Sequence, residues 1–192
     1  MMSSREDRSA GPIYQLKITL KDSRPPIWRR ILVAGDVSLA KLHGILQIVM
    51  GWTDSHLHQF TIHGRDYGVP DRELDFGHRT LSERRVRLFE VVYGEKDRFL
   101  YEYDFGDSWT HQILVEKIIP KEEGKHYPVC VAGKRACPPE DCGGIWGYEN
   151  FLEAIKDAGH PEHEDMIEWI GGGFDAEAFS LDEVNQRLRR LR

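Results

Sequence analysis

Residues 99–115 constrain the fold of this chain most, because their side chains alternate between apolar and polar with a period of two. That period is typical of a β-strand with one buried face. Gly106, Asp107 and Ser108 interrupt the alternation with turn-forming residues. The stretch therefore predicts an antiparallel hairpin, in which each cross-strand aromatic pair contributes about 0.2–1 kcal/mol. The side chains expected on its shared face are Phe99, Tyr101, Tyr103, Phe105, Trp109, His111, Ile113 and Val115.

Similar alternation predicts further strands earlier in the chain, and helical spacing predicts one helix among them. Ser38 is the expected N-cap of that helix and Gly51 its end. Pro25-Pro26 stands in the turn between the first two strands. The strands are predicted over residues 14–20, 27–33 and 56–63, and the helix over residues 39–50.

The last third of the chain has helical patterns in place of strands. Residues 64–87 and 120–144 are expected to be irregular, because glycine, proline and charged residues break up any period. Strands followed by helices indicate an α+β fold: one domain with an antiparallel sheet, an aromatic hairpin, one early helix and C-terminal helices. Those helices are predicted over residues 148–158, 162–170 and 175–191, with a short helical turn near residues 88–92.

Length and composition predict one cytoplasmic domain over residues 13–192, preceded by a flexible leader over residues 1–12. The leader is polar and lacks the apolar core of a signal peptide. Three cysteines do not make a complete disulfide set, which agrees with a reducing compartment. A net charge of -6 argues against a general nucleic-acid binder, because such proteins usually carry a strong positive field.

Two stretches, residues 101–111 and 137–148, combine aromatic rings, carboxylates and glycines, the composition of a contact surface. Trp146 and Tyr148 are expected to anchor the second stretch against the core. Glu140 and Asp141 precede a predicted helix N-terminus, where the helix dipole favours negative charge. The candidate binding residues are Tyr101, Tyr103, Asp104, Asp107, Trp109, His111, Glu140, Asp141, Trp146 and Tyr148.

The carboxylates and the histidine of the hairpin allow two interpretations. Asp104, Asp107 and His111 together are able to orient a general base or complete a metal site. Alternatively, Asp107 caps the turn by accepting backbone N–H groups, and His111 is a half-buried, hydrogen-bonded member of the sheet.

Two further sets of residues have the chemistry of metal ligands. His56 and His58 are two residues apart, so in a strand both imidazoles point from the same face. Cys130, Cys137 and Cys142 fall within thirteen residues and form a candidate zinc site. Reduced cysteines are also common as small buried apolar residues. A third interpretation makes Cys142 an activated thiolate at a helix N-terminus.

Several of these motifs, in this order, resemble the plasmid pRiA4b ORF-3-like family. The resemblance extends from about Ile13 to Leu191. It implies a single α+β domain and no assigned catalytic residues. The matching segments are Pro26-Ile-Trp-Arg-Arg30, Met50-Gly-Trp52, His56-Leu-His-Gln-Phe60, Tyr103–His111, Cys137–Gly144 with Gly147-Tyr148, and Trp169-Ile-Gly171.

Three functions are compatible with the sequence. The first is a non-catalytic binding or interaction module for a protein or small molecule, built on the hairpin and the Cys137–Tyr148 loop. The second is a metal-dependent, hydrolase-like enzyme, for which zinc is the candidate cofactor. The third is a DNA-associated accessory factor, which the family's mobile-element neighbours and the basic C-terminal segment suggest.

Overall fold

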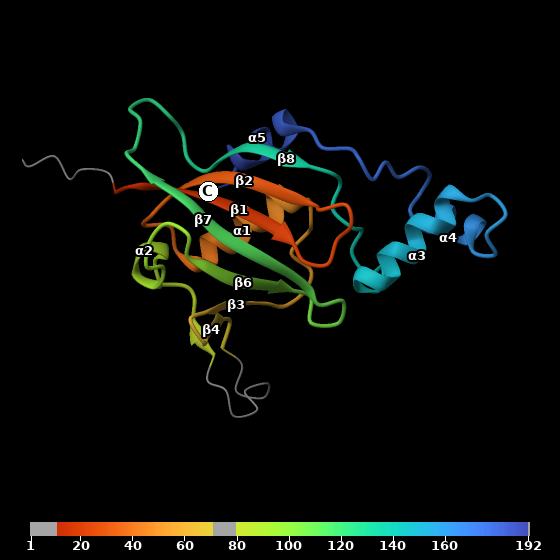
Figure 1. The fold of residues 1–192 in the computed structure, drawn as a ribbon, viewed down its shortest axis with the longest axis horizontal. Helices are drawn as coiled ribbons and strands as arrows, with labels where there is room; N and C mark the ends of the chain where they lie inside the picture. Colours follow the sequence, from red (N-terminus) through yellow and green to blue (C-terminus); the bar gives the residue numbers. More distant parts are fainter. Residues whose placement is uncertain (1–10, 71–79, 192) are drawn as a thin grey trace, which may run out of the picture.

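The centre of the protein is one continuous sheet, seen in a computed structural model that describes residues 11–70 and 80–191 (Figure 1). Its strands, within those residues, are β1 (Ile13–Leu20), β2 (Trp28–Ala34), β3 (His58–Ile62), β4 (Arg65–Gly68), β5 (Leu81–Ser82), β6 (Arg98–Tyr103), β7 (Trp109–Ile119) and β8 (Val129–Lys134). They lie in the order β5-β4-β3-β6-β7-β1-β2-β8. Neighbouring strands are antiparallel except β4 and β5. The predicted α+β class with an antiparallel sheet is confirmed.

The helices of the described residues are α1 (Leu39–Met50), α2 (Leu88–Val91), α3 (Gly144–Lys156), α4 (His163–Trp169) and α5 (Leu181–Leu188). Figure 1 shows α1 lying across one face of the sheet, while α3 and α4 lie beyond one end of it. Helix α5 contacts both β8 and α1. None of the described helices is long and apolar enough to cross a membrane.

Helix α1 follows its sequence signals closely. The Ser38 hydroxyl accepts a hydrogen bond from the Lys41 N–H, and Gly51 ends the helix with a φ of 102°. Leu42 and Leu46 are fully buried against the sheet. The helix therefore contributes buried apolar side chains that pack beneath the central strands.

The predicted hairpin is formed by β6 and β7. Tyr101 pairs with His111 and Tyr103 with Trp109, and all four side chains are fully buried. Phe105 departs from the prediction: β6 ends at Tyr103, so Phe105 lies in the turn and is 49% exposed.

Strands β8 and β3 differ from the sequence prediction. Residues 129–134, expected in a loop, form β8 and pair with the outer edge of β2. Its short, weakly alternating sequence carries little strand signal, and the free edge of β2 supplies the pairing. Strand β3 begins at His58 rather than at residue 56, so His56 does not belong to the strand face.

Other boundaries also shift. The segment predicted to be irregular contains β4 and β5, and its residues 71–79 lie outside the described part of the chain. Helix α3 begins at Gly144, earlier than predicted, and α5 covers only the centre of the predicted last helix. The predicted leader lies outside the described residues except for Gly11 and Pro12.

Candidate functional site

The two motif-rich stretches meet at one end of the sheet, where Glu140 ties three chain segments together. Its carboxylate accepts hydrogen bonds from the Tyr103 hydroxyl at 2.5 Å and from the Thr53 hydroxyl at 2.5 Å. The Thr53 N–H is a third donor, at 3.3 Å. Burial raises the pKa of Glu140, but the bonds from Thr53 and Tyr103 outweigh it, so the net pKa is lowered. The carboxylate is therefore a structural clamp as well as a predicted contact residue.

The turn of the hairpin uses its two aspartates differently from the prediction. Asp104, which has a φ of 58°, caps the turn by accepting the Gly106 N–H at 2.9 Å. Asp107 instead accepts the Gly143 N–H at 3.2 Å, across the gap to the start of α3. The cap was expected from Asp107 and is made by Asp104, because β6 ends one residue before it.

Glycine makes this contact between the turn and α3 possible. A Cβ atom on Gly144 would lie 2.6 Å from the Asp107 carbonyl oxygen, and the φ of Gly144 is 69°. Both observations exclude an ordinary side chain there without displacement of the backbone. The Gly143-Gly144 pair thus permits close packing of the two motifs.

Most of the predicted contact residues are part of the core. Tyr101, Tyr103, Trp109 and His111 have no exposed surface, and Tyr148 is 6% exposed. They therefore do not form a contact surface themselves. Trp146 is more exposed than predicted: it was expected to anchor the loop against the core, yet it is 82% exposed.

His56 lies between two carboxylates at the junction, the region where the hairpin turn meets the Cys137–Tyr148 loop. Its Nδ1 is 3.7 Å from an Asp104 oxygen, and its Nε2 is 3.2 Å from an Asp141 oxygen. One ligand atom from each of these residues lies within 4.8 Å of the others, so the three side chains form a candidate cation site. No lysine or arginine of the described residues pairs with Asp104 or Asp141.

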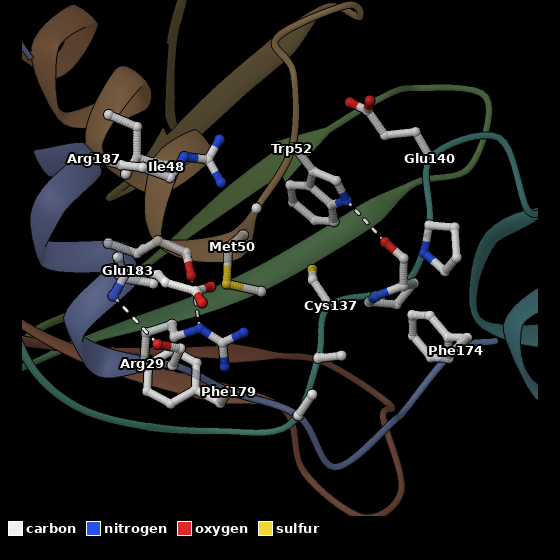
Figure 2. A pocket seen from close by; sticks show the side chains of 18 of the residues that line it. Arg29, Ile48, Met50, Trp52, Cys137, Glu140, Phe174, Phe179, Glu183 and Arg187 are labelled. Carbon is white, nitrogen blue, oxygen red and sulfur yellow. Dashed lines mark hydrogen bonds between the residues drawn. The ribbon is translucent and has the colours of Figure 1, made fainter. Parts of the chain in front are cut away.

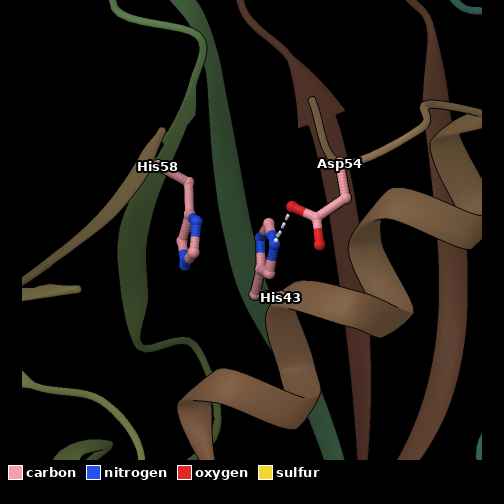
Figure 3. A group of neighbouring side chains, drawn as sticks. All are labelled: His43, Asp54 and His58. Atoms are coloured by element: carbon pink, nitrogen blue, oxygen red, sulfur yellow. Dashed lines mark hydrogen bonds and ion pairs between the residues drawn. The ribbon is translucent and has the colours of Figure 1, made fainter. Parts of the chain in front are cut away.

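His58 belongs to a second, separate cluster, which Figure 3 shows with His43 of α1 and Asp54. His43 Nε2 is 2.8 Å from Asp54, and His58 Nε2 is 2.9 Å from the buried Glu83. The imidazoles are stacked, with centroids 3.4 Å apart and planes 4° from parallel. Lone pairs of ring nitrogens lie in the ring plane, so these two rings do not converge on one ion in this arrangement.

His56 and His58 are consequently not joint ligands of one site, as their spacing had predicted. His43, Asp54 and Glu83 were not predicted as site residues. His43 lies on the apolar face of α1. A histidine on a face that is otherwise apolar is the one feature of the sequence that could have pointed to this cluster. Its pKa is lowered by burial and by His58, while Asp54 opposes the shift.

The cysteines lie outside both clusters. Cys130 is buried in β8, and burial raises its pKa. Burial, with smaller contributions from Asp107 and Asp141, raises the pKa of Cys142 to about 12. That direction is opposite to the one required of an activated thiolate.

A cavity of about 370 Å³ opens next to the junction (Figure 2). The C-terminal end of α1, the start of the Cys137–Tyr148 loop and the segment leading into α5 form its walls. Trp52 links the cavity to the hairpin: its indole N–H donates to the Pro138 carbonyl oxygen at 3.1 Å, and its ring stacks on Tyr103 at 4.9 Å. The apolar lining includes Ile48, Met50, Trp52, Phe174, Phe179 and Val184.

Arg29, on β2, is the innermost charged group of this cavity. It is 2% exposed, and Phe179 lies over its guanidinium at 4.3 Å. Figure 2 shows the guanidinium among the apolar side chains of Met50, Phe179 and Cys137. The residues next to Arg29 in the sequence give no sign that this arginine is buried.

Comparisons with known proteins agree with this architecture. The family model described as "Plasmid pRiA4b ORF-3-like protein" matches residues 12–183. The "Uncharacterized protein y4hQ" of Sinorhizobium fredii (strain NBRC 101917 / NGR234) is 39% identical over 182 residues, 93% of this chain and 92% of that protein. The crystal structure of a protein of unknown function, MM3350 from Methanosarcina mazei Go1, is similar with a TM-score of 0.81 and 40% identity. That match covers 90% of this chain and 97% of the other. The chain therefore belongs to the plasmid pRiA4b ORF-3-like protein family.

Proposed function

We propose that this protein is a non-catalytic binding module that takes a small molecule into the cavity beside the Cys137–Tyr148 loop. The observation that carries the proposal is the cavity itself, about 370 Å³ with a largely apolar lining drawn from separate chain segments. Small-molecule sites are typically concave, mostly apolar and about 300–1,000 Å³ in volume.

The surroundings of the cavity support binding rather than thiol chemistry. Cys137 is the cysteine that lines the wall, and burial raises its pKa well above the usual range. A half-buried thiol with a raised pKa stays protonated at neutral pH and is a poor nucleophile. The hairpin contacts the cavity wall indirectly, because the ring of Tyr103 stacks on the ring of Trp52, which lines the cavity.

Three probes with the same phenylbutyl body test this proposal: 4-phenylbutanoate, 4-phenylbutanamide and 4-phenylbutan-1-amine. We expect at least one to bind the unmodified protein, as followed by saturation-transfer NMR and by a shift of the Met50 methyl signal. Ala178→Trp places bulk on an exposed part of the cavity wall and should abolish binding. Ala158→Trp is the matched control, since Ala158 is exposed and does not line the cavity.

Absence of binding by all three probes would count against the proposal. Binding that survives Ala178→Trp in a folded protein would place the ligand elsewhere.

A metal-dependent enzyme is the second candidate, and the arrangement around His56 favours it. Each nitrogen of this imidazole faces a carboxylate, and the Asp104 side chain is 10% exposed. Imidazole and carboxylate ligands suit Zn²⁺, Fe²⁺ or Mn²⁺. A metal-bound water would then be the nucleophile.

Elemental mass spectrometry of untagged protein purified without chelator tests the metal site. Near-stoichiometric metal should be lost in His56→Ala and kept in His63→Ala. His63 is a matched control, because it also pairs with an aspartate, Asp97, and is similarly exposed. Metal-free protein after reconstitution, or equal loss in both variants, would remove this candidate.

A further inference from the structure

Arg29 is a buried cation with no anionic partner among the described residues. Its guanidinium donates only to backbone carbonyl oxygens, which carry partial charge and no net charge. Burial of an ionised group is costly unless an opposite charge or strong hydrogen bonds compensate for it. The acceptors are the carbonyl oxygens of Val49 at 2.7 Å, Trp28 at 2.9 Å, Lys134 at 3.0 Å and Arg135 at 2.8 Å.

These bonds leave one donor free. A guanidinium has five N–H groups, and the four bonds use one from Nε, two from Nη1 and one from Nη2. The second N–H of Nη2 has no acceptor within the part of the chain that the structure describes. Because Arg29 lines the cavity, an acceptor for this group is able to come from a bound molecule.

The other charged groups of the cavity do not neutralise Arg29. Glu140 is held by Thr53 and Tyr103, and Figure 2 shows its carboxylate on the far side of Trp52 from Arg29. Glu183 and Arg187 both lie on exposed positions of α5, at the rim. The interior of the cavity therefore has one net positive charge surrounded by apolar side chains.

We infer that the cavity binds a small organic carboxylate with an apolar body, and that Arg29 is the residue that holds its carboxylate. This inference rests on the proposed function. One free N–H and one uncompensated positive charge match a single carboxylate. A phosphate dianion would bring twice the charge to the same one donor. The apolar body would contact Met50, Phe174 and Val184, which line the same cavity.

The ligand charge series tests the inference without altering Arg29, whose bonds to four carbonyls make its replacement a risk to folding. By isothermal titration calorimetry, we expect 4-phenylbutanoate to bind at least tenfold more tightly than 4-phenylbutanamide, with 4-phenylbutan-1-amine weakest. The preference should persist at 0.5 M KCl, because salt screens a buried charge pair far less than an exposed one.

Variants separate the two arginines of the cavity. Arg187→Gln should leave the preference for the carboxylate unchanged, while Arg29→Lys, which keeps the charge but loses the planar fork, should reduce it at least tenfold in a folded protein. Equal binding of the acid and the amide would overturn the carboxylate inference and leave the binding module standing. A preference that disappears in Arg187→Gln or in high salt would assign the anion to the rim and overturn the role of Arg29. If no probe binds, both the inference and the proposed function fail.

Discussion

His111 shows what a single buried imidazole does to the stability of this fold. It is fully buried, its Nδ1 lies 3.3 Å from the Tyr101 carbonyl oxygen, and its Nε2 has no hydrogen-bond partner among the described residues. Burial lowers the pKa of His111 from about 6.5 to about 4. The neutral ring is therefore the form that the folded protein tolerates.

This depressed pKa predicts acid sensitivity. The unfolded chain binds the proton near pH 6.5 and the folded chain only near pH 4, so the stabilisation is complete above pH 6.5 and is lost as the pH falls toward 4. The free energy of unfolding should decrease by about 3 kcal/mol across that window. His111→Phe should remove most of this dependence, as measured by urea unfolding between pH 4 and pH 7.5. Parallel pH profiles for the unmodified protein and His111→Phe would show that His111 is not the source of the acid sensitivity. His43, whose pKa is also lowered, is present in both proteins and would then be the alternative source.

At the scale of elements, the junction depends on how closely α3 approaches the loop before it. A Cβ atom on Gly147 would lie 1.9 Å from the Cys142 carbonyl oxygen. Gly44, in the middle of α1, has only the Leu191 side chain near its Cβ position, at 3.7 Å. A side chain at Gly147 would therefore clash with the backbone, whereas there is room for one at Gly44.

Alanine at these two positions should therefore change stability in opposite directions. Gly147→Ala should lower the free energy of unfolding by about 2 kcal/mol or more, because backbone must move. Gly44→Ala should raise it by about 0.5–1 kcal/mol, because alanine restricts the unfolded chain and favours the helix. Chemical denaturation of both variants measures the difference. Destabilisation of the same size in both would show that the close contact at Gly147 is not decisive.

At the scale of the whole molecule, one side chain of the C-terminal helix hydrogen-bonds to the backbone of strand β8. Asn185 of α5 accepts the Cys130 N–H at 2.8 Å and donates to the Cys130 carbonyl oxygen at 2.9 Å. The Asn185 amide thereby pairs with the Cys130 backbone as a neighbouring strand would, along the outer edge of β8. The same helix brings Val184 and Arg187 to the cavity, so this clamp also positions the proposed binding site.

Asn185→Ala should loosen this clamp. Leaving the Cys130 backbone groups unpaired should cost about 1–3 kcal/mol, and amide hydrogen exchange should speed up in β8 and α5 before it does in β6 and β7. Gln186→Ala, at an exposed neighbouring position, is the control and should leave exchange unchanged. Uniformly faster exchange throughout the sheet would indicate that α5 is not a separable unit.

Local periodicity was sufficient for the hairpin, for α1 and for the α+β class, because side-chain alternation and helix caps act within a few residues. It failed for β8 and for Phe105, where pairing with β2 and the early end of β6 decide the outcome. The motif-rich stretches do converge, but most of their aromatic residues are core, and the exposed side chains include Phe105, Trp146 and Asp141.

The sequence by itself determined the family, the class of fold and the two segments that form the junction. Only the tertiary structure decided that His56 and His58 part into different clusters, that Asp104 rather than Asp107 caps the turn, and that Arg29 is buried at a cavity wall. Short-range patterns report which face of an element is apolar. Burial of a charge and convergence of ligands depend on which distant segments pack together, and that information lies in contacts between residues such as Arg29 and Lys134, far apart in the chain.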